Sequence, residues 1–122
     1  MAADSRQEVL DQQHERSYRN LENSRKSAKK KTQYDSNKTR NDLARLFRER
    51  FGNDPYDWQI DVSEAMILGL DAIVIAGTGS GKTMPFMMPL LINTSKKVII
   101  ISPLKVLQLD QVRPFHCCDN LN

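Results

Sequence analysis

Apolar residues are sparse in the first third of the chain and periodic in the rest. In residues 1–40 they stand isolated among Gln, Asn, Ser, Lys, Arg and Glu, which predicts a mobile or marginally helical tail. Beyond it, Leu43, Phe47 and Phe51 recur at helical spacing, and Gly52 can end this helix. The pattern therefore predicts a polar tail followed by an ordered region.

A second helix is predicted downstream of the first. Asp57 can act as its N-cap, Ile60 lies on its apolar side, and Gly69 can close it. We therefore divide the chain into a polar basic tail, residues 1–40, and an ordered region, residues 41–122.

Two β-branched runs predict strands. Residues 71–76 and 97–102 are short and mostly apolar, as expected of parallel strands buried on both faces of a sheet. Residues 84–93 lie between them and are rich in Met, Leu and Phe, which favours a buried helix that Pro89 should kink. Strand, helix and strand in this order make a right-handed βαβ unit. The predicted fold class is therefore α/β.

The segment between the first predicted strand and this helix reads A-G-T-G-S-G-K-T, which fits a phosphate-binding loop. Its residues are Ala76, Gly77, Thr78, Gly79, Ser80, Gly81, Lys82 and Thr83. Glycines let successive N–H groups turn toward one anion without a Cβ in the way. Lys82 would bring charge to the β- and γ-phosphates of ATP, and the Thr83 hydroxyl would ligate Mg²⁺. The alternative is an ordinary glycine-rich turn, which gives the Lys-Thr pair no role.

The positive charge of the chain is concentrated in the tail. Residues 1–40 hold 10 Lys and Arg against 6 Asp and Glu, whereas the remainder holds 8 against 9. The densest basic run, residues 25–31, has three interpretations: a solvated charged segment, a nuclear import signal, or an arm that contacts phosphates. It contains no aromatic residue, which weakens a role in binding single strands.

Composition also excludes some classes of protein. No apolar stretch is long enough to span a membrane, and the N-terminus has no signal-peptide pattern. The two cysteines, Cys117 and Cys118, are adjacent and cannot form a disulfide framework. We therefore expect a soluble, intracellular protein.

Gln59 and residues 102–112 narrow the class. Gln59 stands 23 residues before Lys82, and residues 102–112 read S-P-L-K-V-L-Q-L-D-Q-V. With the phosphate loop, these segments resemble the first RecA-like domain of superfamily 2 helicases, a P-loop NTPase domain. Residues 102–112 match the S-P-L-x-x-L-x-x-D-Q form of motif Ia in RecQ-type helicases, where DEAD-box RNA helicases carry a P-T-R-E-L type of sequence.

Two departures from the RecQ pattern keep the DEAD-box alternative open. The phosphate loop is closer to the DEAD-box form than to the M-P-T-G-G-G-K-S common in RecQ proteins. Tyr56 replaces the arginine usual three residues before the glutamine, although Phe51-Gly52 matches a RecQ pair. Because motif Ia matches over more positions, the resemblance favours a RecQ-like helicase.

The resemblance implies roles for individual residues. Gln59 would recognise adenine, because a carboxamide both donates and accepts and can pair with the N6 and N7 edge. It could otherwise be a surface glutamine on a helix. Ser102 and Pro103 would contact the nucleic-acid backbone, or else only end a strand. The implied partner is DNA, or RNA for the DEAD-box alternative, and the implied location is the nucleus.

The sequence contains no Asp-Glu pair. In these helicases a D-E-x-H or D-E-A-D motif holds Mg²⁺ and orients the attacking water. We therefore expect a chain that ends before this motif, binds ATP and Mg²⁺ weakly at best, and does not hydrolyse ATP alone. Two functional hypotheses follow. The first is an ATP-binding and nucleic-acid-binding fragment of a RecQ-like 3′–5′ DNA helicase, with a DEAD-box-like RNA helicase fragment as its variant. The second is a non-catalytic product that binds nucleotide or nucleic acid weakly.

Overall fold

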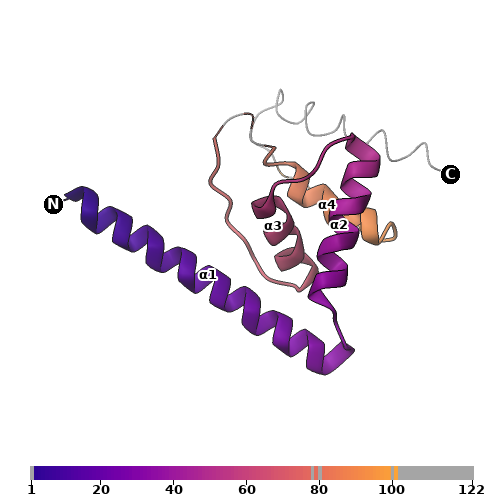
Figure 1. The fold of residues 1–122 in the computed structure, drawn as a ribbon, viewed down its shortest axis with the longest axis horizontal. Coiled ribbons are helices and arrows are strands. Elements are labelled where there is room, and N and C mark those ends of the chain that lie inside the picture. Colours follow the sequence, from indigo (N-terminus) through magenta and orange to yellow (C-terminus); the bar gives the residue numbers. More distant parts are fainter. Residues whose placement is uncertain (1, 78, 80, 100, 102–122) are drawn as a thin grey trace.

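Four helices make up the regular structure in the part of the chain that is described. The structure, a computed structural model, describes residues 2–77, 79, 81–99 and 101. The helices are α1 (Ala2–Thr32), α2 (Ser36–Phe51), α3 (Asp57–Ile67) and α4 (Met84–Ile92). Helices α2, α3 and α4 pack against one another, whereas α1 is a long rod whose N-terminal half projects beyond them (Figure 1).

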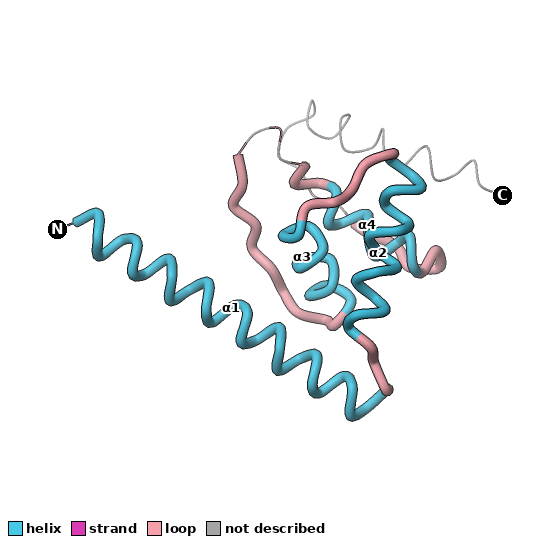
Figure 2. The backbone as a smooth tube through the Cα atoms, in the orientation of Figure 1, coloured by secondary structure: helices cyan, strands magenta, loops and turns pink. Residues whose placement is uncertain are grey.

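The predicted α/β class is wrong: within the described residues there is no strand. Residues 71–77 and 96–99 are loops, and the first of these runs alone past the helices (Figure 2). Ile73 and Ile75 are 93% and 96% exposed. A β-branched run favours a strand, but a strand exists only where its N–H and C=O groups pair with a neighbour. Neither segment has such a neighbour among the described residues, so composition alone misled the prediction.

Most of the polar tail forms one long helix. Its sequence allowed a disordered or a helical state, and residues Ala2–Thr32 are helical throughout. Asp4 lies in the first turn and Lys29, Lys30 and Lys31 lie in the last, which matches the helix dipole at both ends. Nearly all its side chains are exposed, and Leu21 is the one buried apolar residue among those described.

Helix α2 has a well-formed cap at each end. The Asp35 carboxylate accepts a hydrogen bond from the Lys38 N–H at 3.2 Å, so the helix starts at Ser36, earlier than the apolar spacing predicted. Gly52 ends it in the left-handed conformation, with φ of 80°, and donates its N–H to the Arg48 carbonyl at 2.9 Å. The predicted role of Gly52 is confirmed.

The core lies where α2, α3 and α4 meet. Its buried members come from all three helices and are Leu43, Phe47, Ile60 and Met88. The Phe47 and Phe51 rings stack in a tilted arrangement with their centroids 4.7 Å apart. Phe51, Ile67, Met84 and Leu91 are among the partly buried residues that surround this cluster. The core is therefore small and fixes the position of α3 against α4.

Helix α4 contains two prolines and depends on α3 for a hydrogen bond. Pro89 has no N–H, so the Pro85 carbonyl four residues earlier lacks its helical donor. The Ser63 hydroxyl of α3 lies 3.1 Å from this carbonyl oxygen and 2.7 Å from the Gln59 carbonyl oxygen. Ser63 is fully buried, as is Pro85. The helix predicted over residues 84–93 is confirmed to within one residue, and it continues past Pro89 to Ile92.

Helix α3 begins one residue away from the predicted cap. Its N-cap is Tyr56, and Asp57 is the first helical residue. Gly69 follows the last turn with φ of 81°, as expected of a residue that closes a helix. None of the described helices combines the length and the hydrophobicity that a membrane-spanning segment needs.

Candidate nucleotide-binding site

Two glycines of the predicted phosphate loop take a backbone conformation that glycine adopts more readily than other residues. Gly79 has φ of 78° and Gly81 has φ of 74°, both in the left-handed region that favours glycine. A Cβ on Gly79 would meet open space, whereas a Cβ on Gly81 would lie 2.6 Å from the Gln59 Nε2 atom. Glycine is therefore required at position 81 for its backbone angle and for its lack of volume. Thr78 and Ser80 lie outside the described residues.

Lys82 and Thr83 close the loop at the start of α4. The exposed Lys82 amine donates a hydrogen bond to the Ala76 carbonyl at 2.9 Å, so the side chain folds back over its own loop. Thr83 is the N-cap residue of α4, and its side chain makes no capping hydrogen bond. An amine beside the loop and a hydroxyl free of capping at the helix start fit the binding of a phosphate with its cation.

Gln59 connects α3 to the phosphate loop. Its side chain is almost completely buried, at 3% exposure for the residue. The Gln59 Oε1 atom accepts a hydrogen bond from the Tyr56 N–H at 2.8 Å, and Nε2 donates to the Gly81 carbonyl at 3.0 Å. The Met84 N–H donates to the same Gly81 oxygen at 3.2 Å. The predicted adenine-binding glutamine therefore lies directly beside the predicted phosphate loop.

A cleft of about 410 Å³ joins these elements. Its walls come from the end of α2, the start of α3 and the loop, and the residues that matter here are Phe51, Tyr56, Gln59, Gly79 and Gly81. Tyr56 is 63% exposed, so its ring is accessible at the edge of the cleft. Aromatic side chains, a carboxamide and a glycine-rich loop in one cleft are suited to a planar base with a phosphate chain.

The described residues offer no ready-made metal centre, because no three His, Cys, Asp or Glu side chains among them converge. Mg²⁺ in nucleotide sites is commonly held by few protein ligands together with the phosphates and water. A site of that kind needs few protein donors, and the Thr83 hydroxyl is the candidate donor from this chain. A larger cleft of about 800 Å³ lies between the end of α1 and the start of α2, and no predicted site residue lines it.

The structure brings together most of the described site residues. Gln59, Gly79 and Gly81 share the cleft, and Ala76 is hydrogen-bonded to Lys82. Ser102 and Pro103, the predicted nucleic-acid contacts, lie outside the described residues.

Sequence reasoning missed two buried polar residues of α3, Ser63 and Glu64. The spacing of Gln59 and Ser63, four residues apart, would have placed both on one helix face. No local pattern indicated that Glu64 is buried.

Comparison with known protein families identifies the family of the chain. The DEAD/DEAH box helicase family matches residues 56–120, which is more than half of the chain and includes Gln59 and the whole phosphate loop. The chain belongs to the DEAD/DEAH box helicase family.

A curated relative agrees with the RecQ-like resemblance. The chain is 39% identical over 67 residues to the ATP-dependent DNA helicase Q-like SIM of Arabidopsis thaliana. The matched region covers 54% of this chain and 8% of that protein, so the chain spans less than a tenth of the length of this relative. The recognition of a RecQ-like superfamily 2 helicase is confirmed. No solved structure matches the chain.

Proposed function

We propose that this chain supplies the ATP-binding site of a RecQ-like DNA helicase. The observation that carries the proposal is the hydrogen bond between Gln59 Nε2 and the Gly81 carbonyl, which holds a base-recognising side chain and a phosphate loop in one cleft. The family match over residues 56–120 supports it, because helicases of this kind act on nucleic acids with ATP.

In this proposal the adenine enters the cleft beside Tyr56 and pairs with the Gln59 carboxamide. Each polar atom of that carboxamide has one partner in the chain, which leaves one N–H and one oxygen lone pair for adenine. The phosphates lie against the loop, where the Lys82 amine moves from the Ala76 carbonyl to the phosphate oxygens. The Thr83 hydroxyl would help to hold Mg²⁺, which would neutralise part of the phosphate charge.

The nucleic-acid part of the proposal rests on the sequence and the relative. Ser102 and Pro103 would contact the backbone of a DNA strand, and the whole protein would unwind DNA with 3′–5′ polarity in the nucleus. The tail of residues 1–40 and the ATP-binding region of residues 41–122 remain the proposed division of the chain.

Nucleotide titration of the purified chain tests the proposal. With fluorescent ATP and GTP analogues and Mg²⁺, we expect the chain to prefer ATP. Lys82→Ala should weaken the binding of both nucleotides by about tenfold or more, because the loop loses the positive charge that pairs with the phosphates. Gln59→Ala should weaken the binding of ATP more than the binding of GTP, because the proposed contact of Gln59 is with adenine. Lys97→Ala removes an exposed lysine outside the loop and is the matched control.

Two results would contradict the assignment. If Lys82→Ala binds as tightly as the unaltered chain, the loop is an ordinary turn. If Gln59→Ala weakens ATP and GTP equally, Gln59 supports the loop and does not read the base.

A further inference from the structure

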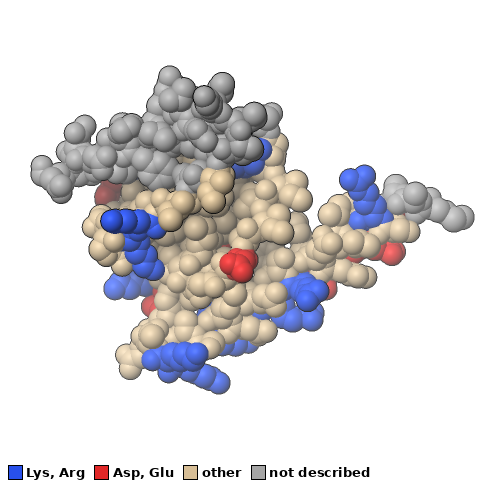
Figure 3. All heavy atoms as spheres, turned by 180° about the vertical axis from the view of Figure 1, so that it is seen from behind, with Lys and Arg blue, Asp and Glu red and all other residues tan. Residues whose placement is uncertain are grey.

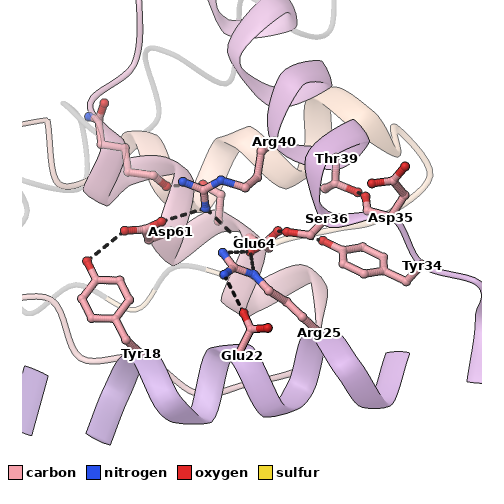
Figure 4. A network of polar contacts seen from close by, with 12 residues as sticks. Tyr18, Glu22, Arg25, Tyr34, Asp35, Ser36, Thr39, Arg40, Asp61 and Glu64 are labelled. Carbon is pink, nitrogen blue, oxygen red and sulfur yellow. Dashed lines mark hydrogen bonds and ion pairs between the residues drawn. The ribbon is translucent and has the colours of Figure 1, made fainter. Parts of the chain in front are cut away.

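Glu64 is a fully buried carboxylate at the junction of three helices (Figure 4). Its Oε1 atom accepts from Arg25 of α1, through Nε at 2.5 Å and through Nη2. Its Oε2 atom accepts from Tyr34 at 3.1 Å and from Ser36 at 2.6 Å. Arg40 of α2 lies 3.6 Å from Oε1. Both oxygens of this buried charge are therefore satisfied, which a buried carboxylate requires.

Asp61, one turn earlier on α3, repeats the arrangement nearer the surface. Its Oδ2 atom accepts from the Tyr18 hydroxyl of α1 at 3.0 Å, and its Oδ1 atom accepts from Arg40 at 2.7 Å. Tyr18 and Arg25 stand seven residues apart, on the same face of α1, with the buried Leu21 between them. Helix α1 thus contacts α3 at two acidic positions on one side of that helix.

The docking of α1 depends on these polar contacts. The other three helices share an apolar core, and no residue of α1 belongs to it. Lys and Arg side chains project into solvent at several points along α1 (Figure 3). Burial lowers the pKa of Arg25, but the hydrogen bond and the charge of Glu64 outweigh this effect, and the pKa of Arg25 lies above its ordinary value. Arg25 therefore carries its positive charge at physiological pH.

The contacts of Tyr18 and Arg25 with Asp61 and Glu64 form what we call the α1 dock. Helix α3 connects this dock to the nucleotide cleft. Glu64 and Asp61 face α1 and α2, while Gln59 and Ser63 contact the phosphate loop and α4. Gln59 is in the first turn of α3 and Glu64 is five residues further along. A rotation of α3 that separates Arg25 from Glu64 therefore also moves Gln59 relative to Gly81, because a helix turns as a rigid unit.

We propose that α1 is a positioning element for base recognition, and that Arg25 acts through Glu64 to hold α3 in the rotation that places Gln59 in the cleft. Arg25 and Glu64 are positioning residues, since neither lines the cleft. The inference rests on the proposed ATP site and adds its regulation: release of α1 weakens discrimination between adenine and guanine.

Base discrimination by the full chain is the test. The ratio of GTP to ATP dissociation constants should fall by about threefold or more in Arg25→Ala and in Glu64→Gln. In the double variant Arg25→Ala/Glu64→Gln the ratio should fall no further than in either single variant, because each single change already removes the same ion pair. Arg25→Lys keeps the charge and should recover part of the ratio. Arg19→Ala is the matched control, because Arg19 is exposed on the same helix and forms no ion pair with any described residue.

A purely structural role for the pair predicts a different result. Loss of general stability would weaken ATP and GTP by the same factor and leave their ratio unchanged, which would overturn the inference. Should Arg25→Ala or Glu64→Gln fail to fold, Arg25→Lys and Tyr18→Phe loosen the same dock more gently. An unchanged ratio in both, with α1 released, would also overturn it.

Hydrogen exchange of the α3 amides separates this inference from the proposed function. Exchange around Gln59 should rise in Arg25→Ala and not in Arg19→Ala, with no nucleotide present. If the unaltered chain binds neither nucleotide, the proposed function is rejected. Raised exchange in Arg25→Ala would still show that Arg25 and Glu64 hold α3 in place. If exchange around Gln59 is unchanged, the inference is rejected whether or not ATP binds.

Discussion

The core and the α1 dock hold helices together in opposite ways. Leu43, Phe47, Ile60 and Met88 join three helices without a polar atom between them except in the thioether of Met88. The dock joins α1 to α3 through carboxylates, a guanidinium group and a hydroxyl, with one buried leucine on α1. Apolar packing has no charge to screen or titrate, whereas charged contacts respond to ionic strength and to pH. The molecule thus combines a fixed unit with a helix whose attachment can be adjusted.

Removing a core side chain should have the largest effect. Leu43→Ala leaves a cavity at a fully buried position and should lower the free energy of unfolding by about 3 kcal/mol. Thermal unfolding followed by circular dichroism measures it. Val9→Ala, at a position 51% exposed on α1, is the control and should change little. A loss of less than about 1 kcal/mol in Leu43→Ala would mean that the apolar cluster does not hold the three helices together.

A polar group inside the fixed unit should have an intermediate effect. Ser63→Ala removes the single hydroxyl hydrogen that the Gln59 and Pro85 carbonyls share in this buried region. The cost should be about 1–2 kcal/mol, measured by urea unfolding. Ser27→Ala, at an exposed position of α1, is the control and should be neutral or slightly stabilising. If Ser63→Ala and Ser27→Ala are equally stable, the Ser63 hydroxyl does not replace the N–H that Pro89 lacks.

The Tyr18 contact of the dock should show the smallest effect, and a dependence on pH. The hydrogen bond to Asp61 and its negative charge raise the pKa of Tyr18 above its ordinary value of 10.0. A raised pKa means that the folded state favours the neutral phenol, so the contact contributes below pH 10 and is lost as pH rises through the folded pKa. Hydrogen exchange of α1 should therefore increase above about pH 10.

Tyr18→Phe provides the control for this pH dependence. It lacks the titrating hydroxyl and should show the increase to a smaller extent. The absorbance of tyrosinate identifies the ionisation itself. An α1 helix that stays docked to the end of the titration would show that Leu21 and Arg25 suffice without Tyr18.

Local patterns predicted the parts of the fold that depend on local chemistry. The end of α2 at Gly52 follows from the left-handed conformation that glycine allows, and α4 follows from its apolar composition. The proximity of Gln59 to the loop was implied only by the family resemblance. For Gly52 and for the apolar residues of α4, the residue type alone limits the local conformation and the degree of burial.

The remaining features depend on partners far away in sequence. Arg25 and Glu64 are separated by 39 residues, and nothing near either residue marks it as half of a pair. The strands predicted around Ile73 and Ile99 failed for the same reason, since no neighbour pairs with them in the described part of the chain. Composition sets what a segment can become, and contacts distant in sequence decide which of these states is reached.

The two prolines of α4 have a consequence for how the chain folds. Helix α4 has nine residues, and two of them cannot donate a backbone hydrogen bond. So short a segment has no helical stability by itself, because helix nucleation is unfavourable. It acquires its shape when Ser63 and the core of α3 are already in place to receive it. The position of Gly81 in the phosphate loop therefore depends on the helix that carries Gln59.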